Sequence, residues 1–131
     1  MSIKEFADKF IKAENEAWLK GNFDALEALE DPNVVYHMPS SQDVVGWEAH
    51  KQYILTGRQT ISDLRQEWKY LTGEGNLFAL SYKSRGILTG ERPGFPPPTG
   101  KEITSDALFV LRLEEDRIVE AWVNGSFKGL D

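Results

Sequence analysis

The 131-residue sequence contains no cysteine. This absence excludes disulfide bonds, thiolate nucleophiles, and zinc or iron–sulfur sites built on cysteine ligands. No segment approaches the roughly 20 apolar residues of a membrane-spanning helix. The first ten residues, MSIKEFADKF, carry Glu5 and Asp8 where a signal peptide needs an apolar run. We therefore expect a cytoplasmic protein with no membrane partner.

Blocks of basic residues are also absent, and the formal net charge is −6. Such a surface does not attract nucleic-acid phosphates, so we expect no nucleic acid as a partner. The sequence has neither a glycine-rich phosphate loop nor a nucleophile elbow. Its two histidines, His37 and His50, are not accompanied by any recognised metal-ligand spacing. The sequence therefore predicts no metal site.

The composition is that of a globular domain, with 40% hydrophobic and 27% charged residues. The length favours one domain over 1–131. Apolar residues recur at three- and four-residue intervals through Trp18, which predicts an amphipathic helix. Ser2 is expected to cap this helix and Gly21 to end it. A second, short helix is predicted after Asn22, ending before Pro32.

The remaining pattern predicts one short strand, one helix and then four long strands. The segment NVVYHMP, residues 33–39, is β-branched and aromatic, whereas 47–57 repeats with helical spacing. Two pairs of antiparallel strands are expected to turn at 73–76 and at 115–116. This order predicts an α+β fold in which helices cover one face of a curved sheet.

The strand predicted around residues 104–113 carries apolar side chains on both faces. Phe109 and Leu111 lie on one face, and Leu108 and Val110 lie on the other. A sheet covered by helices on one side would then leave an apolar patch outside, which is typical of a protein–protein interface. We expect a homodimer through the outer sheet face. The alternative is a few scattered exposed apolar residues.

Four segments in order, DPNVVYHMP, VGWEAHKQYI, GFPPPTGKEI and RLEEDRIVEAW, resemble the SnoaL-like polyketide cyclase branch of the nuclear transport factor 2-like superfamily. The resemblance covers nearly the whole chain. It implies a cone-shaped fold whose N-terminal helices close an apolar pocket, with frequent homodimers and no cofactor. Members include polyketide cyclases, steroid isomerases, dehydratases, epoxide hydrolases and non-catalytic binding proteins. The resemblance therefore implies a small apolar or aromatic ligand without identifying a reaction.

The cyclases of this family use an aspartate on the last strand and a histidine on the strand before it. The matching positions here are Val123 and Phe109. Neither side chain can transfer a proton, and loss of a positioned acid or base typically costs 10²–10⁴-fold in rate. Glu120 falls on the opposite face of the predicted strand. The cyclase mechanism is therefore not carried over to this chain.

Three other residues are candidates for acid/base chemistry: His37, Tyr36 and Asp106. His37 titrates near neutrality and stands where the steroid isomerases have a carboxylate base. Side-chain alternation, however, turns it away from Tyr36, whose face the resemblance directs into the pocket. Asp106 resembles part of the Asp–Arg–Asp set of the epoxide hydrolases, the alternative being a surface ion pair. For His50 we expect simple burial on its helix.

Ligand contacts are expected from five aromatic or apolar residues and one polar amide: Trp18, Tyr53, Trp68, Phe109, Val123 and Asn124. Alternation points Asn124 away from the pocket unless its strand bulges. For the segment PGFPPPTG, residues 93–100, the resemblance implies a rigid loop between strands, beside the pocket mouth. Two functional hypotheses remain. One is a cofactor-free isomerase, cyclase or dehydratase, and the other is a non-catalytic ligand-binding or dimeric assembly module.

Overall fold

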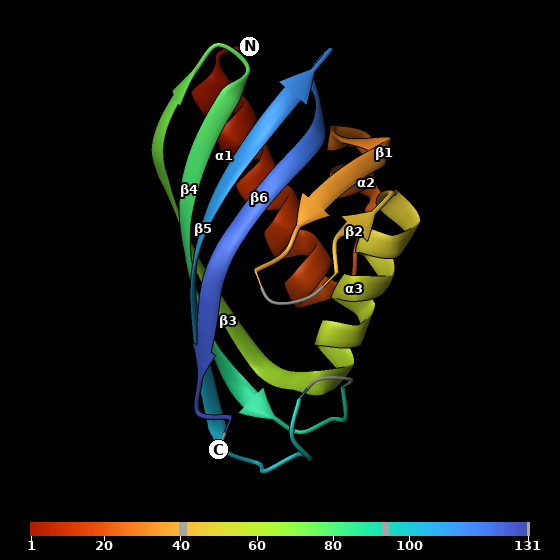
Figure 1. The fold of residues 1–131 in the computed structure, drawn as a ribbon, viewed down its shortest axis with the longest axis vertical. Helices are drawn as coiled ribbons and strands as arrows, with labels where there is room; N and C mark the ends of the chain where they lie inside the picture. The colour runs from red at the N-terminus through yellow and green to blue at the C-terminus, as the bar shows by residue number, and fades with distance from the viewer. Residues whose placement is uncertain (40–41, 93–94, 131) are drawn as a thin grey trace.

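The computed structural model describes residues 1–39, 42–92 and 95–130, so Pro93 and Gly94 of the predicted loop lie outside the described residues (Figure 1). The chain forms helices first and long strands afterwards. The helical elements are α1 (Ile3–Asn15), η1 (Glu16–Lys20), α2 (Asp24–Leu29) and α3 (Trp47–Thr60). The strands are β1 (Glu30–His37), β2 (Val44–Val45), β3 (Ile61–Glu74), β4 (Leu77–Leu88), β5 (Glu102–Glu114) and β6 (Arg117–Lys128).

One six-stranded sheet has the order β2-β1-β6-β5-β4-β3. β1 runs parallel to β6, and the other neighbours are antiparallel. Figure 1 shows the long strands curving around α1, with α3 on the same side of the sheet. The predicted α+β fold, with helices on one face of a curved sheet, is confirmed.

The N-terminal helix is capped as its sequence predicts. The Ser2 hydroxyl accepts a hydrogen bond from the Glu5 N–H at 3.1 Å, and Gly21 ends the helical segment with a left-handed φ of 71°. Between these ends the helix widens into the π-helical turn η1, which the apolar spacing does not predict. Such turns occur frequently at functional sites. Trp18 lies within this turn.

The long strands alternate as predicted, and they turn where predicted. At the β5–β6 turn, Glu115 and Asp116 both have left-handed φ values, 51° and 60°, which match the right-handed twist of a two-residue hairpin. On β5, Leu111 is buried against the helices while Leu108 and Val110 are exposed. The inner face packs on α1, where Phe6 meets Phe78 edge-on at 5.9 Å between ring centroids. The core therefore lies between α1 and the concave face of the sheet.

Two element boundaries differ from the prediction. β1 begins at Glu30 rather than at Asn33, and its register against β6 shifts between Glu30 and Val35. α3 continues through Gly57 to Thr60. Gly57 is needed there for space, because a Cβ atom would lie 2.3 Å from Cζ3 of the Trp18 ring. Within the described residues no helix is long and apolar enough to cross a membrane.

Candidate functional site

A cavity of about 560 Å³ lies between the helices and the concave face of the sheet. This volume is in the range of small-molecule sites. Five residues of the predicted ligand-binding set line it: Trp18, Tyr53, Trp68, Phe109 and Val123. The cavity is therefore a space within the protein rather than a core filled by these side chains.

The sheet side of the cavity is an aromatic wall. Trp68, Tyr82 and Phe109 come from three adjacent strands, β3, β4 and β5, and each occupies an inward position of its strand. The centroid of Trp68 lies 4.4 Å from that of Tyr82 and 5.1 Å from that of Phe109. On the helix side, Trp18 packs edge-on against Tyr53 at 6.2 Å. Flat apolar faces on both sides suit an aromatic or similarly flat ligand.

A buried polar cluster adjoins the cavity, and two of its members, Tyr36 and His50, line it. Glu30, at the start of β1, receives two hydrogen bonds on its two carboxylate oxygens. His50 Nδ1 of α3 lies 2.9 Å from Oε1, and the Tyr36 hydroxyl donates to Oε2 at 2.9 Å. The Tyr36 and His50 rings also stack, with centroids 4.1 Å apart. The network is satisfied internally although all three residues are buried.

Burial and neighbouring charges shift the pKa values of His50 and Tyr36 within this cluster. Burial on its own lowers the pKa of His50, but the charge and hydrogen bond of Glu30 outweigh it, and the pKa of His50 is raised. Burial, followed by the charge of Glu30, raises the pKa of Tyr36 well above its ordinary value. Tyr36 therefore stays a neutral hydrogen-bond donor, and His50 and Glu30 form a charge-assisted pair.

Glu14, in the last turn of α1, is the acidic side chain that the sequence analysis missed. It is only 2% exposed, yet it lines the cavity. Burial raises its pKa to about 7, with the charge of Glu30 acting in the same direction and the charge of His50 opposing it. A carboxyl group that titrates near neutrality inside an apolar cavity is suited to general acid/base work.

A signal for Glu14 exists in the sequence. The apolar stripe of the first helix runs through Ala7, Phe10 and Ala17, and position 14 falls on that same face. A charged residue within such a stripe is rarely buried unless it has a partner or a function. Apolar spacing predicts this helix from its apolar members alone, so it assigns no role to Glu14.

Glu14, Glu30 and His50 also form the one group of potential metal ligands found among the described residues, with one ligand atom from each within 4.8 Å of the others. Carboxylate and imidazole donors suit several divalent cations. His50 Nδ1 and both Glu30 oxygens, however, already make hydrogen bonds of 2.9 Å to one another and to Tyr36. A cation would have to replace those bonds, so the arrangement as it stands fits a proton network better.

His37 lies outside the cavity, on the outer face of the sheet. Its Nδ1 is 2.9 Å from Asp43 and its Nε2 is 2.6 Å from Glu120, and its ring stacks on Trp122. The hydrogen bond with Glu120 is the main cause that raises the pKa of His37. Period-two alternation explains the placement, since Tyr36 faces inward. His37 therefore does not line the cavity, whereas Tyr36 does, with its hydroxyl hydrogen-bonded to Glu30.

Asp106 and Asn124 are the two remaining candidates, and both are exposed. Asp106 borders the cavity, but among the described residues its carboxylate makes no hydrogen bond or ion pair. Two of the arginines are engaged elsewhere, since Arg85 pairs with Glu102 and Arg58 donates to the Trp18 carbonyl. Asn124 pairs regularly with Leu108 on the outer face, without the bulge that would turn it inward. Asn124 is therefore not part of the cavity wall.

The sequence and the fold of this chain are both similar to those of known proteins. The SnoaL-like polyketide cyclase family matches residues 9–125. A proposed SnoaL-like polyketide cyclase from Jannaschia sp. CCS1 shares the fold with a TM-score of 0.82 and 17% identity, over 96% of this chain and 90% of its own. IdmH, a proposed polyketide cyclase from Streptomyces antibioticus, has a TM-score of 0.72 and 25% identity, over 93% and 92%.

An NTF2-like protein of unknown function from Burkholderia pseudomallei K96243 has the same fold, with a TM-score of 0.74 and 16% identity over 96% of this chain and 92% of its own. No curated protein matches the sequence. The family match spans most of the chain, and the shared fold agrees with it. The chain therefore belongs to the SnoaL-like polyketide cyclase family, within the NTF2-like fold.

Proposed function

We propose that this protein binds a small, flat, largely apolar molecule in its inner cavity and moves a proton on it through Glu14, without a cofactor. The observation that carries the proposal is the position of Glu14. It is a buried carboxyl group on the wall of an otherwise aromatic cavity. Isomerisation, cyclisation and dehydration without a cofactor each use proton transfer of this kind.

The proposed step is removal of a proton from a carbon next to a carbonyl group. Ionised Glu14 accepts the proton, and the electron pair of the C–H bond moves onto the carbonyl oxygen to give an enolate. Return of the proton to another atom completes an isomerisation. Alternatively, attack of the enolate carbon on a second carbonyl closes a ring, and Glu14 returns the proton to the alkoxide oxygen that forms. With a pKa of about 7, Glu14 can both take up and give back the proton near neutral pH.

The proposed acid/base group lies on helix α1, whereas the cyclases have theirs on the sheet. Val123 and Phe109, the positions of the acid/base pair in the cyclases, do line the cavity but cannot exchange protons. Glu14 reaches the same space from α1. A ligand held between the aromatic wall and the helix would meet its proton-transfer group on the helix side.

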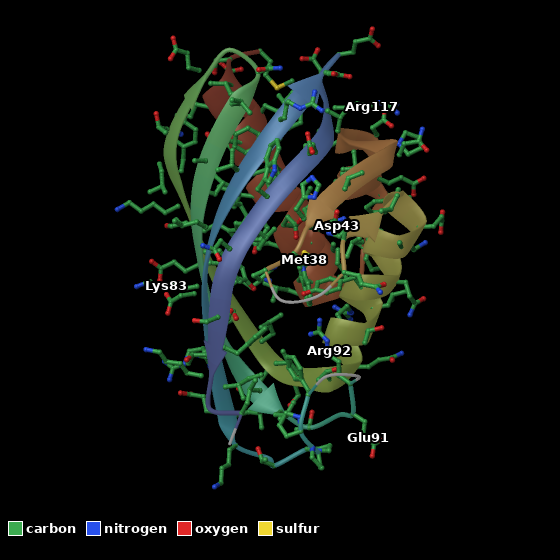
Figure 2. All side chains as sticks on the ribbon, viewed as in Figure 1. Met38, Asp43, Lys83, Glu91, Arg92 and Arg117 are labelled. Carbon is green, nitrogen blue, oxygen red and sulfur yellow. The ribbon has the colours of Figure 1, made fainter. Side chains whose placement is uncertain are left out.

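Ligand binding is tested by filling the cavity. We expect Ala107→Trp to weaken binding of the fluorescent probe phenylnaphthylamine by about tenfold or more, because the indole occupies ligand space. Ala107 lines the cavity from β5. The matched control is Lys83→Trp, since Lys83 is exposed and points away from the sheet (Figure 2). Unchanged affinity in Ala107→Trp, measured by fluorescence titration, would contradict binding in this cavity.

The alternative hypothesis is a module that binds a ligand or assembles without catalysis. Its specific support is the outer face of the sheet. Leu108, Val110 and Trp122 are 53%, 38% and 40% exposed, and Val110 pairs directly with Trp122 across β5 and β6. Three large apolar side chains on adjoining strands form a patch that favours a partner surface. We propose that this patch, which we call the outer patch, joins two copies of the chain.

The dimer proposal can be tested by introducing one charged side chain into the outer patch. Leu108→Lys is expected to convert a dimer into a monomer, because a lysine at the centre of an apolar interface would be buried without a partner. The measurement is the molar mass from light scattering after gel filtration. Leu19→Lys is the control, since Leu19 is 44% exposed on η1, away from the sheet. A monomeric wild type, or a dimer that survives Leu108→Lys, would overturn the proposed interface.

A further inference from the structure

A positively charged residue, Arg92, stands on the connection between β4 and β5, at the end of the cavity opposite β1. Arg92 lines the cavity, and Figure 2 shows it rising from this connection into the space between the sheet and α3. Its guanidinium carbon lies 4.9 Å from the centroid of the Tyr53 ring and 4.7 Å from that of Phe95. The two aromatic rings hold the planar cation through cation–π contacts.

The guanidinium group of Arg92 makes no hydrogen bond or ion pair within residues 1–39, 42–92 and 95–130. Three other arginines of the chain do have partners: Arg58 donates to the Trp18 carbonyl, Arg85 to Glu102, and Arg112 to Glu114 and Glu120. Aromatic contacts use the faces of a guanidinium plane and leave its N–H edges free. Arg92 is therefore positioned by its neighbours while its donors remain available.

The helix side of the cavity links Arg92 to the acidic site through aromatic contacts. Trp18 follows Glu14 by one helical turn, Trp18 packs on Tyr53, and Tyr53 packs on Arg92. Glu30 is paired with His50, so ionised Glu14 carries the negative charge at one end of this path, and Arg92 carries the positive charge at the other. An anionic group on a ligand would be repelled by ionised Glu14 and attracted by the guanidinium. The charges therefore orient a ligand that carries one acidic end.

We propose that Arg92 binds an anionic group of the ligand, of the carboxylate or sulfonate class, and that the natural ligand is a flat apolar molecule with such an acidic end. Guanidinium recognises these groups through two parallel N–H···O bonds, which gives direction as well as charge. The inference rests on the proposed binding function, and it specifies the ligand class. The acidic end at Arg92 leaves the other end of the ligand beside Glu14.

Two probes with the same aromatic body test the proposal. Anilinonaphthalene sulfonate carries one sulfonate group, and phenylnaphthylamine is its neutral counterpart. We expect Arg92→Gln to weaken binding of the sulfonate probe by about tenfold or more, because hydrogen bonds to charged groups are lost. Binding of the neutral probe should change by less than about twofold, which corresponds to a few tenths of a kcal/mol.

Two further variants control for charge and for the location of the probe. Arg65→Gln makes the same change in net charge at an exposed position of β3 and should leave both affinities unchanged. Ala107→Trp should weaken both probes, which places them in the cavity rather than on the outer patch. Equal weakening of both probes by Arg92→Gln, or no weakening of either, would overturn the proposal. Failure of both probes to bind the wild type would overturn the proposed function as well.

Discussion

Glu14→Gln is expected to lower kcat/KM for the ring opening of nitrobenzisoxazole by about 10²–10⁴-fold, the range for loss of a positioned general base. This flat aromatic substrate needs only a base. Removal of its ring C–H proton breaks the N–O bond and produces a coloured cyanophenolate, so protons and electrons balance without a cofactor. The reaction therefore reports directly on a carboxylate inside an apolar cavity. Glutamine keeps the size of Glu14 but cannot accept the proton.

The pH dependence separates a catalytic Glu14 from a merely structural one. The rate should rise as Glu14 ionises, with a midpoint near its pKa of about 7. Stability should move in the opposite direction. Because the pKa of Glu14 is raised from 4.5 to about 7 on folding, the folded protein loses stability as the pH rises between these values. Glu14→Gln should remove this loss and be more stable than the wild type above about pH 7.

Exposed carboxylates provide the controls for this experiment. Glu67→Gln, at an exposed position of β3, should retain the wild-type rate, and so should Asp106→Asn. His37→Gln should also retain it, because His37 lies outside the cavity. A wild-type rate no faster than that of a carboxylate buffer, or full activity in Glu14→Gln, would contradict the catalytic proposal. Either result would favour the non-catalytic binding module.

Local patterns in the sequence were sufficient to predict the elements and most of the cavity wall. The helices, the four long strands and both hairpin turns follow from apolar spacing and turn residues. The same period-two alternation predicts that Val123 faces inward and Asn124 outward, as the structure shows. A short stretch of sequence is thus enough to predict which strand residues face the cavity, because alternate side chains point to opposite faces of the sheet.

The polar centre of the site could not be predicted in this way. Glu30 and Tyr36 both belong to β1, whose register against β6 shifts between Glu30 and Val35, and they meet His50 because α3 packs against β1. Such pairings join distant segments, and their register depends on the packing of the whole chain. In the sequence, Glu30 stands at the end of a short charged helix and looks like a solvent-exposed residue. In the folded protein Glu30 is buried instead, and a buried carboxylate must be hydrogen-bonded.

Glu30→Ala is expected to lower the free energy of unfolding by about 3–5 kcal/mol, the range for removing one partner of a buried ion pair. Glu30 is 1% exposed and holds both the His50 ring and the Tyr36 hydroxyl. Its removal leaves His50 buried without its counter-charge and leaves Tyr36 without an acceptor. The measurement is urea-induced unfolding followed by circular dichroism.

Tyr36→Phe separates the contribution of one hydrogen bond from that of the ion pair. It removes the hydroxyl alone, keeps the ring stacked on His50, and should cost only about 1 kcal/mol. The exposed replacement Glu67→Ala should change the stability by less than about 0.5 kcal/mol. A cost of Glu30→Ala no greater than that of Tyr36→Phe would show that Glu30 is not the charged centre of the cluster.

The pH dependence of Glu30→Ala follows from the raised pKa of His50. A group whose pKa is raised on folding contributes its stability fully below its unfolded value, here 6.5, and loses it as the pH rises through the folded value. The cost of Glu30→Ala should therefore be largest below pH 6.5 and decrease at higher pH, where His50 is neutral in both states. A cost that is independent of pH would mean that His50 is neutral in the folded protein. In that case Glu14 would lack the positive charge that opposes the rise in its pKa, and the midpoint of the rate profile should lie above about 7.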